Sequence, residues 1–364
     1  MEALGVTPSF WRGKKVLVTG HTGFKGSWLS LWLQRLGAEV TGFALEPPTE
    51  PSLFVSARVA EGMKSMTGDV RAREAVEAVV SESRPEILFH LAAQSLVRRS
   101  YADPVETYAT NVMGTVHVLE AARRTVNIRA LVNVTSDKCY SNREWLWGYR
   151  EHEPLGGTDP YSSSKACAEL VSGAYRDSFF TADGSRGLPL ALASARAGNG
   201  IGGGDWATDR LMPDVFRAFL EKRPALIRNP AAVRPWQHVL DMLNGYLVLA
   251  ERLRNSGRDC AEAWNFGPYD EDVRPVQWIV ERLGALWGEG AAWEIDRTSQ
   301  PPEAKFLRVD SSKARARLGW RPRLRLDDAL EWTVDWYRQH GRGADVRKIT
   351  EEQIARFEEK GGER

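Results

Sequence analysis

The stretch VTGHTGFKG, residues 18–26, decides the fold class of this chain. It closes a short β-branched run, Lys15–Thr19, and leads into Phe24–Leu36, where apolar residues recur at helical spacing. The turn between the two holds Gly20, Gly23 and Gly26. Glycines at such a turn allow a tight bend and close approach of the backbone to a diphosphate, which rests on the helix N-terminus. Their spacing of three and three residues departs from the usual two and three and is a weak signal by itself. The position of the glycines between a strand and a helix favours a diphosphate site over a plain turn.

Strands and helices alternate through the first half of the chain. We expect further strands at Glu39–Ala44, Glu86–Ala92, Ala130–Thr135 and Leu188–Ala195, and helices at Val105–Arg124 and Tyr161–Phe180. Runs as continuously apolar as Ala130–Thr135 are typical of parallel strands buried on both faces. The sequence therefore predicts an α/β fold with a Rossmann-type, doubly wound parallel sheet.

After Arg196 the regular alternation of predicted strands and helices ends and the residue composition changes. Gly198–Gly204 has five glycines in seven residues, and a polar, Pro- and Arg-rich region runs on to Pro235. Beyond it we expect helices at Val239–Leu253, Trp278–Leu286 and Leu326–Tyr337, and a short strand at Trp264–Gly267. We assign residues 1–198 to the first domain, with 234–268 returning to it. Residues 199–233 and 269–345 then form a smaller, mixed C-terminal domain that binds substrate, and 346–364 a polar tail with one exposed helix and a frayed end.

Composition excludes several classes of protein. The 364 residues are 43% hydrophobic and 27% charged, as in a globular protein. Lys and Arg number 49 against 48 Asp and Glu, so no general attraction to nucleic acid or to anionic membranes is expected. No apolar stretch reaches the roughly 18 residues of a membrane helix. Three cysteines form neither a disulfide framework nor a zinc motif, and Met1–Trp11 does not resemble a signal peptide, so we expect a cytoplasmic protein.

Two groups of residues carry the chemistry. Tyr161 and Lys165 lie four apart on a predicted helix, where a nearby ammonium lowers the cost of forming a phenolate, which can take a proton from an alcohol. Thr135–Lys138 (TSDK) places a hydroxyl, a carboxyl and an ammonium at the carboxyl end of a buried strand, where open α/β sheets bind ligands. An exposed helix face and a helix-capping turn are the plainer alternatives.

The acidic residue that usually binds the adenosine ribose is missing. The second strand ends at Ala44, and Glu46 follows two residues later. No arginine stands beside Ala44 to receive a 2′-phosphate, so NAD is favoured over NADP, although the choice stays open. Asp69 and Val70 are candidates for contact with the adenine.

These motifs resemble the extended short-chain dehydrogenase/reductases, and among them the CDP-glucose 4,6-dehydratases. The matching segments are VTGHTGFKGSWL, HLAAQSLVRRSY, TNVMGT, NVTSDKCY, GGTDPYSSSKACAEL, ARAGNGIGGGDWATDR and RPWQHVLD. They span about residues 14–240, and weaker agreement continues to about 335. The glycine and tyrosine motifs identify the superfamily only, whereas Ser136–Lys138 and GGGDWA are more specific.

The resemblance implies an internal redox cycle with NAD as cofactor, CDP-glucose as substrate and a 4-keto-6-deoxy sugar as product, as in deoxysugar and lipopolysaccharide biosynthesis. Tyr161 would take the C4 hydroxyl proton, helped by Ser136 and Lys165. Lys138 would remove the C5 proton and Asp137 would protonate the departing C6 hydroxyl. The C4 ketone is the electron sink, so no metal is expected.

Two positions depart from the wider group. The related dTDP-glucose dehydratases carry a glutamate in place of Lys138, and a lysine base needs the opposite pKa tuning. Lys138 beside Asp137 would also favour an ion pair, so their protonation states stay open. Gly200 stands where an apolar residue is expected, which puts only local loop geometry in doubt.

The resemblance also implies binding residues. Those expected to bind the cofactor are Gly20, Thr22, Gly23, Phe24, Lys25, Gly26, Asp69, Val70, Leu91, Ala92, Ala93, Thr135, Tyr161 and Lys165. Those expected to bind the substrate are Gln94, Arg196, Asn199, Arg210 and Arg234. A homodimer or homotetramer is expected, built on the two helices around Val105–Arg124 and Tyr161–Phe180. One alternative is another nucleotide-sugar epimerase or decarboxylase of the superfamily, which would need no Asp137–Lys138 pair, or another dehydratase. A second is a non-enzymatic NAD(P)-sensing regulator, which commonly lacks the catalytic tyrosine or lysine.

Overall fold

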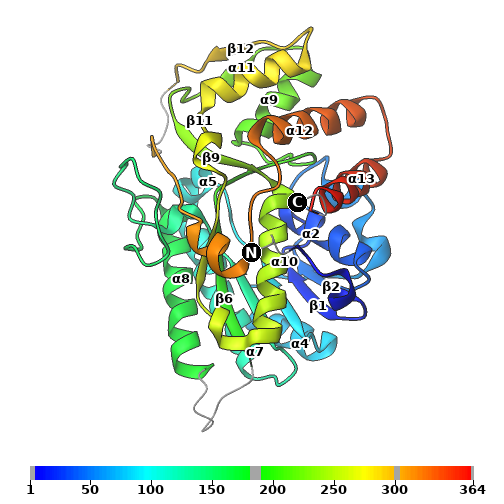
Figure 1. Ribbon diagram of the computed structural model, residues 1–364, viewed down its shortest axis with the longest axis vertical. Helices are drawn as coiled ribbons and strands as arrows, with labels where there is room; N and C mark the ends of the chain where they lie inside the picture. Colours follow the sequence, from blue (N-terminus) through cyan, green and yellow to red (C-terminus); the bar gives the residue numbers. More distant parts are fainter. Residues whose placement is uncertain (1–4, 181–189, 299–303, 362–364) are drawn as a thin grey trace.

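The computed structural model describes residues 5–180, 190–298 and 304–361. Its centre is a seven-stranded sheet in the order β10-β6-β5-β4-β1-β2-β3, in which all neighbouring strands are parallel. These strands are β1 (Lys15–Thr19), β2 (Glu39–Ala44), β3 (Lys64–Thr67), β4 (Ile87–His90), β5 (Ala130–Val134), β6 (Ala191–Ala197) and β10 (Ala263–Phe266). The doubly wound α/β fold is therefore confirmed (Figure 1).

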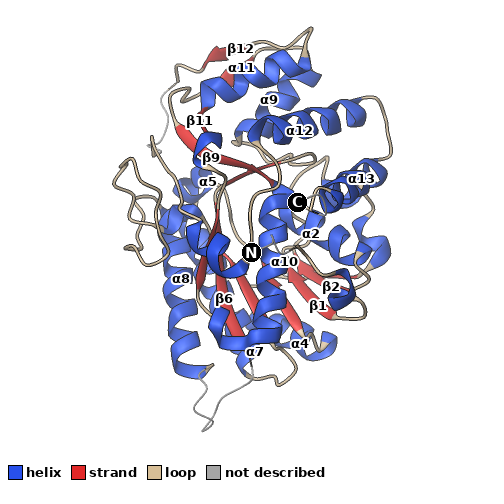
Figure 2. Ribbon diagram, viewed as in Figure 1, coloured by secondary structure: helices blue, strands red, loops and turns tan. Residues whose placement is uncertain are grey.

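Helices lie on both faces of the sheet (Figure 2). The α-helices are α1 (Pro8–Trp11), α2 (Phe24–Arg35), α3 (Leu53–Ser56), α4 (Arg73–Ser83), α5 (Val97–Ala102), α6 (Pro104–Tyr108), α7 (Gly114–Arg123), α8 (Pro160–Phe179), α9 (Leu211–Leu220), α10 (Val239–Ser256), α11 (Val276–Trp287), α12 (Leu326–Gly341) and α13 (Val346–Glu359). Segments η2 (Ala109–Met113) and η6 (Ala314–Leu318) are π-helical, and η1 (Val59–Gly62), η3 (Asp137–Cys139), η4 (Gly257–Cys260) and η5 (Asp270–Asp272) are 3₁₀ turns.

Alternate side chains of each strand point to opposite faces. Val16 and Val18 of β1 pack in one core with α2 and α10, whereas Leu17 packs in a second core with α4 and α7. Every residue of β4, β5 and β6 is buried. This double coverage explains why these strands read as continuous apolar runs rather than alternating ones.

A smaller region lies at one end of the molecule and comprises α9, α11, α12 and two small sheets (Figure 1). The small sheets have the orders β11-β9-β7 and β12-β8, with β7 (Asn199–Ile201), β8 (Ala225–Ile227), β9 (Val233–His238), β11 (Val273–Pro275) and β12 (Trp293–Ile295). Strand β10 returns to the large sheet beside β6, and α10 packs against β5 and β6. The proposed domain boundaries stay a prediction.

Two segments differ from the expectation. The polar region before Pro235 contains α9, whose Met212, Val215, Phe216 and Phe219 are buried at helical spacing. The terminal helix α13 is not exposed, because the Phe357 ring meets the Trp32 ring of α2 edge-on at 5.6 Å. Few apolar residues suffice for burial when they share one face of a helix.

Among the residues described, no helix is both long enough and apolar enough to cross a membrane.

Candidate active site

The glycine turn after β1 packs closely against the protein's own backbone and leads into an uncapped helix. Gly20 has φ +77°, and a Cβ there would lie 2.7 Å from the Ala92 backbone nitrogen. A Cβ on Gly26 would lie 2.1 Å from the Gly20 carbonyl oxygen. Gly23 is the N-cap of α2 and no side chain caps the helix, so its first N–H groups remain available to an anion. The turn therefore fits a dinucleotide diphosphate.

The loop after β4 is tied to the end of β1. The Thr19 hydroxyl accepts hydrogen bonds from the backbone nitrogens of Leu91 and Ala92, both at 3.2 Å. Since β1 pairs with β2 on one side and with β4 on the other, this is the point at which the strand order reverses. Leu91–Ala93 thus adjoin the glycine turn, as expected for residues that bind the cofactor.

The two residues that follow Gly20 pack against β2 and the segment after it. The His21 ring is buried against Gly42, where a Cβ would lie 2.3 Å from it, and its Nε2 is 2.7 Å from the Ser65 hydroxyl. Thr22 donates to the Leu45 carbonyl at 2.9 Å. Burial lowers the pKa of His21 to about 4, so the ring is neutral at pH 7.

Asp69 and Val70 follow β3. The Asp69 carboxylate is held by Arg71, whose Nε donates to it at 2.8 Å. Val70 is buried against Gly114 of α7. Only Asp69 of this pair offers a partly exposed side chain, and a contact of Val70 with adenine would be limited to its backbone.

The predicted catalytic residues meet at the carboxyl end of β5. Ser136 caps the 3₁₀ turn η3, and its hydroxyl donates to Asp137 Oδ1 at 3.0 Å and accepts from the Lys138 backbone nitrogen at 3.2 Å. The Tyr161 phenol of α8 also hydrogen-bonds with Ser136. Lys165, one helical turn along α8, donates to the Val134 carbonyl at 3.3 Å. Ser136 therefore links the tyrosine to the carboxyl group.

Burial dominates the electrostatics of these groups. It raises the pKa of Tyr161 to about 12, more than the Ser136 hydrogen bond lowers it. The help expected from the Lys165 ammonium therefore does not bring the pKa of Tyr161 below its ordinary value, because the phenol is deeply desolvated. Burial also lowers the pKa of Lys165 to about 8. It raises the pKa of Asp137, against the opposing effect of Lys138, Ser136, Arg234 and Lys25.

Lys25 extends from the first turn of α2 toward the catalytic groups. Its Cε lies 3.6 Å from the position of a Cβ on Gly200, and its charge acts on Asp137 and Lys165. Burial, followed by the charge of Arg210, lowers the pKa of Lys25 to about 8. A cation in the first turn opposes the helix dipole unless an anion binds there.

Three of the predicted substrate residues surround this end of β5. Arg210 donates to Asp205 Oδ2 at 3.0 Å and to the Ser95 hydroxyl at 2.6 Å, and its charge acts on Tyr161. Arg234 is buried, and its charge acts on Asp137. Asn199, which begins β7, is half-buried.

The side chains of two predicted substrate residues are hydrogen-bonded to other groups of the protein. Arg196 Nη1 donates to the Tyr140 hydroxyl and to the Glu151 carbonyl, and its Nη2 donates to Glu169. The Gln94 amide turns back to the backbone of Leu96, at 2.6 and 3.1 Å. We therefore remove Arg196 and Gln94 from the set of substrate ligands. An arginine at a strand end reads the same in sequence whether it faces ligand or core.

Thr135 has a similar supporting place. Its hydroxyl donates to Glu169 Oε1 at 2.5 Å, so its side chain holds the strand end rather than a ligand. Glu169, which anchors both Thr135 and Arg196, was missed by the sequence analysis, as was Asp205, which orients Arg210. Asp205 could have been found, because it is the aspartate of the GGGDWA segment.

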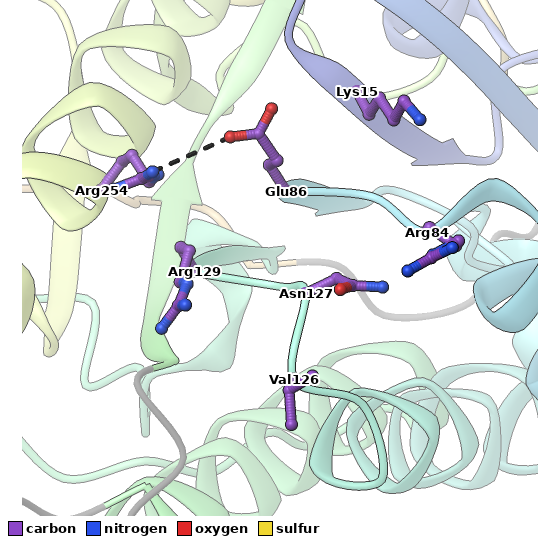
Figure 3. A pocket seen from close by; sticks show the side chains of 7 residues that line it. All are labelled: Lys15, Arg84, Glu86, Val126, Asn127, Arg129 and Arg254. Atoms are coloured by element: carbon purple, nitrogen blue, oxygen red, sulfur yellow. Dashed lines mark ion pairs between the residues drawn. The ribbon is translucent and has the colours of Figure 1, made fainter.

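A hollow of about 650 Å³ lies at the opposite, N-terminal edge of the sheet (Figure 3). It is lined by Lys15, Arg84, Glu86, Val126, Asn127, Arg129 and Arg254. Arg84 ends α4 and Arg254 lies in the last turn of α10, where cations offset the negative ends of helix dipoles. Glu86 lies 3.8 Å from Arg254. The hollow holds none of the predicted site residues, and we assign it no part in the reaction.

The sequence of this chain matches the GDP-mannose 4,6 dehydratase family over residues 17–333. The chain belongs to this family. It is 53% identical to the CDP-glucose 4,6-dehydratase of Salmonella typhimurium over 352 residues, which are 97% of this chain and 98% of that protein. It is 30% identical to the dTDP-glucose 4,6-dehydratase of Streptomyces griseus, over 89% of this chain and 94% of the relative. The predicted resemblance is therefore confirmed.

Solved structures show the same family fold. The dTDP-glucose 4,6-dehydratase of Bacillus anthracis in complex with NAD superposes with a TM-score of 0.74 at 23% identity, covering 91% of this chain and 99% of that one. The UDP-glucose-4-epimerase of Stenotrophomonas maltophila with bound NAD gives 0.78 at 22% identity, covering 90% and 99%. Dehydratases and epimerases thus share this architecture, and the site residues must distinguish them.

Proposed function

We propose that this family member is a CDP-glucose 4,6-dehydratase, a lyase that uses NAD and forms CDP-4-keto-6-deoxy-glucose. One observation carries the proposal. The Ser136 hydroxyl connects the Tyr161 phenol with the Asp137 carboxyl, and Lys138 follows directly. Groups suited to oxidise an alcohol and groups suited to eliminate water therefore stand at one strand end. The 53% identity to the Salmonella enzyme supports the CDP-sugar assignment.

The NAD diphosphate would rest on the N–H groups at the start of α2, beside Gly20, Gly23 and Gly26. The expected neighbours along the rest of the cofactor are Thr22, Phe24, Lys25, Asp69, Leu91, Ala92, Ala93, Tyr161 and Lys165, with Val70 and Thr135 contributing only their backbone. When bound, NAD supplies the hydride acceptor and, later in the cycle, the hydride donor. The uncapped helix start and the missing Cβ atoms at the turn support this placement.

Tyr161 takes the proton of the C4 hydroxyl as the hydride leaves C4. Because burial raises the pKa of this phenol, the anion needs support once formed, and the Ser136 hydroxyl supplies a hydrogen bond to it when it turns from Asp137 to the phenolate. Lys165 adds a positive charge one helical turn away. The C4 ketone that results makes the C5 hydrogen acidic.

Lys138 then removes the C5 proton, and Asp137 protonates the C6 oxygen so that water departs. The raised pKa of Asp137 favours its carboxylic acid form, which this role requires. Hydride delivery to C6 and return of a proton to C5 complete the 4-keto-6-deoxy sugar. The substrate diphosphate would be held by Arg210 and Arg234, with Asn199 beside them, since arginine suits bidentate contact with phosphate.

Incubation of the purified protein with CDP-glucose and NAD tests the proposal. We expect the alkaline chromophore of a 4-keto sugar, with slower reaction of UDP-glucose and dTDP-glucose. Formation of a C4 epimer without the chromophore would point to the epimerase alternative. Absence of turnover with every nucleotide sugar would point to a non-enzymatic role.

We also propose a homodimer, or a homotetramer that contains it, built on α6, η2, α7 and α8. Large apolar side chains are exposed on these helices at Val105, Tyr108, Met113, Leu170 and Phe179. Such a surface favours helix pairing with a second copy. Light scattering at micromolar concentration should give at least twice the mass of one chain, and a monomer would contradict it. The three cysteines are free, which suits a reducing cytoplasm.

A further inference from the structure

Two buried polar atoms near the reaction site have no hydrogen-bond partner within the described part of the chain. One is the Tyr246 hydroxyl on α10, whose side chain is fully buried. The other is Asp137 Oδ2, since the Ser136 hydroxyl takes only Oδ1. Buried polar groups without partners are rare and call for an explanation.

The two groups lie in the same region of the core. Helix α10 packs against β5 and β6, and β5 leads into the turn that carries Asp137. The Tyr246 ring lies 5.8 Å from that of Phe266, at the carboxyl end of β10. The charges of Asp137 and Tyr161 both act on the Tyr246 phenol and hold its pKa above the ordinary value, after the larger effect of burial.

Tyr246 is costly to keep if it serves packing alone. A phenylalanine would fill the same volume without burying a hydroxyl that lacks a partner. Other buried tyrosines of this chain satisfy theirs: Tyr140 donates to Asn265 at 2.7 Å, and Tyr337 donates to the Asp205 carbonyl at 2.5 Å. We therefore expect the Tyr246 hydroxyl to gain a hydrogen-bond partner at some stage of the reaction.

We propose that Tyr246 is a positioning residue for Asp137, whose carboxylate accepts the Tyr246 hydroxyl once Asp137 has given up its proton. The proposal rests on the proposed function. In that step the Asp137 proton moves to the C6 oxygen, the C6–O bond breaks with its electron pair to release water, and the electrons left at C5 form the C5=C6 bond. Asp137 is then a buried anion. A donor that strengthens its hydrogen bond as charge develops lowers the barrier to this step.

Other groups also face Asp137. Ser136 donates to Oδ1, and the positive charges of Lys138, Arg234 and Lys25 act on the carboxyl. Arg234 and Lys25 favour the anion with or without Tyr246, Ser136 does so while it donates to Oδ1, and Lys138 does so once it has taken up the C5 proton. The distinct contribution of Tyr246 is a hydroxyl carried by α10, which would move into hydrogen-bond distance of the oxygen that Ser136 leaves without a partner.

Tyr246→Phe tests the proposal, with Tyr337→Phe as a control that loses a satisfied hydroxyl. We expect the Tyr246 variant to unfold at the wild-type Tm or higher, whereas the control unfolds at a lower Tm. With CDP-glucose, Tyr246→Phe should lower kcat by about 10- to 100-fold at an unchanged KM. Reduced nicotinamide should accumulate in single turnovers, because oxidation at C4 precedes the impaired step.

A second readout separates this inference from the proposed function. Carbon-13 NMR of the carboxyl groups, assigned with Asp137→Asn, should show Asp137 titrating at higher pH in Tyr246→Phe than in wild type. This measurement needs no turnover, so an inactive wild type would refute the function while leaving the titration to decide on Tyr246. An unchanged Asp137 titration, a kcat within twofold of wild type, or a Tm loss equal to that of the control would overturn the proposal.

Discussion

The Arg196 guanidinium donates to the Glu169 carboxylate at 2.9 Å, and the two side chains are only 4% and 3% exposed. The pair connects β6 to α8, the helix that carries Tyr161. The Thr135 hydroxyl joins the same carboxylate, so the end of β5 is fixed as well. This deeply buried charge pair therefore fixes the end of β5, where the catalytic residues lie, to β6 and α8.

Breaking the Arg196–Glu169 pair should lower the stability of the protein rather than weaken its binding of substrate. Arg196→Met leaves the Glu169 charge unpaired, which typically costs about 3–5 kcal/mol of unfolding free energy. Urea denaturation measures the loss. Arg210→Lys is the matched control, since it keeps a cation beside the buried Asp205 carboxylate but removes the guanidinium proposed to bind the substrate. It should keep most of the stability and raise KM. A stable Arg196→Met variant with a raised KM would restore Arg196 as a substrate ligand.

The glycine turn gives a second test. Gly26→Ala should abolish NAD binding or folding, because the new Cβ would lie 2.1 Å from the Gly20 carbonyl oxygen. Gly284→Ala on α11 is the control, since the nearest heavy atom there is 3.9 Å away. The control should unfold at the same or a slightly higher Tm, and NAD titration should distinguish the two variants. Normal NAD affinity in Gly26→Ala would show that the turn relaxes.

Several elements could be predicted from the sequence because a local pattern reflects their environment. Strand β2 matches the prediction in both bounds, and β1 does as well, because β-branched runs next to glycine mark buried strands. The KSMT strand β3 was missed, since three of its four residues are exposed and its polar side chains give no apolar signal. Helix α9 was missed because its apolar residues stand in a polar, glycine-rich context.

Some features of the site could likewise be predicted from the sequence, and others could not. Ser136, Asp137, Lys138, Tyr161 and Lys165 could be assembled in advance, since strand ends of a parallel sheet share one edge. The pKa of Tyr161 could not be foreseen, because it depends on burial by segments distant in sequence. The roles of Arg196 and Gln94 depend on which groups lie within hydrogen-bond distance in the folded protein, and no sequence pattern shows this.

Lys138 and Asp137 should affect different half-reactions. Lys138→Ala should still oxidise C4, because Tyr161, Ser136 and Lys165 are intact, and should then stall with reduced nicotinamide absorbance on mixing with substrate. Loss of a general base costs about 10²–10⁴-fold in turnover. Asp137→Asn should keep some exchange of the C5 hydrogen with deuterated solvent, while Lys138→Ala should lose it. Absence of reduced nicotinamide in Lys138→Ala would mean that the lysine serves C4 oxidation or substrate positioning.

Stability should depend on pH through buried His90. Its ring lies between the hydroxyls of Thr19, at 2.8 Å, and Thr115, at 3.2 Å, and burial lowers its pKa to about 3 from 6.5. The unfolded chain binds a proton below pH 6.5 and the folded chain does not, so the stabilisation is present above pH 6.5 and is lost as the pH falls toward 3.

His90→Gln removes this proton linkage. Relative to the variant, the wild type should lose about 1.4 kcal/mol of unfolding free energy per pH unit below pH 6.5. Urea denaturation of both proteins between pH 7 and pH 5 measures the difference, and other titrating groups cancel in the comparison. Parallel pH dependences would show that the pKa of His90 is the same in the folded and unfolded protein.

The central claim is that one hydride leaves C4 and returns to C6 of the same sugar. Conversion of CDP-glucose carrying deuterium at C4, followed by NMR and mass analysis of the product, tests it most directly. The account predicts that the deuterium is found at C6 and that reduced nicotinamide does not build up. Loss of the deuterium to solvent, or reduced nicotinamide equal in amount to product, would contradict it and identify an ordinary dehydrogenase.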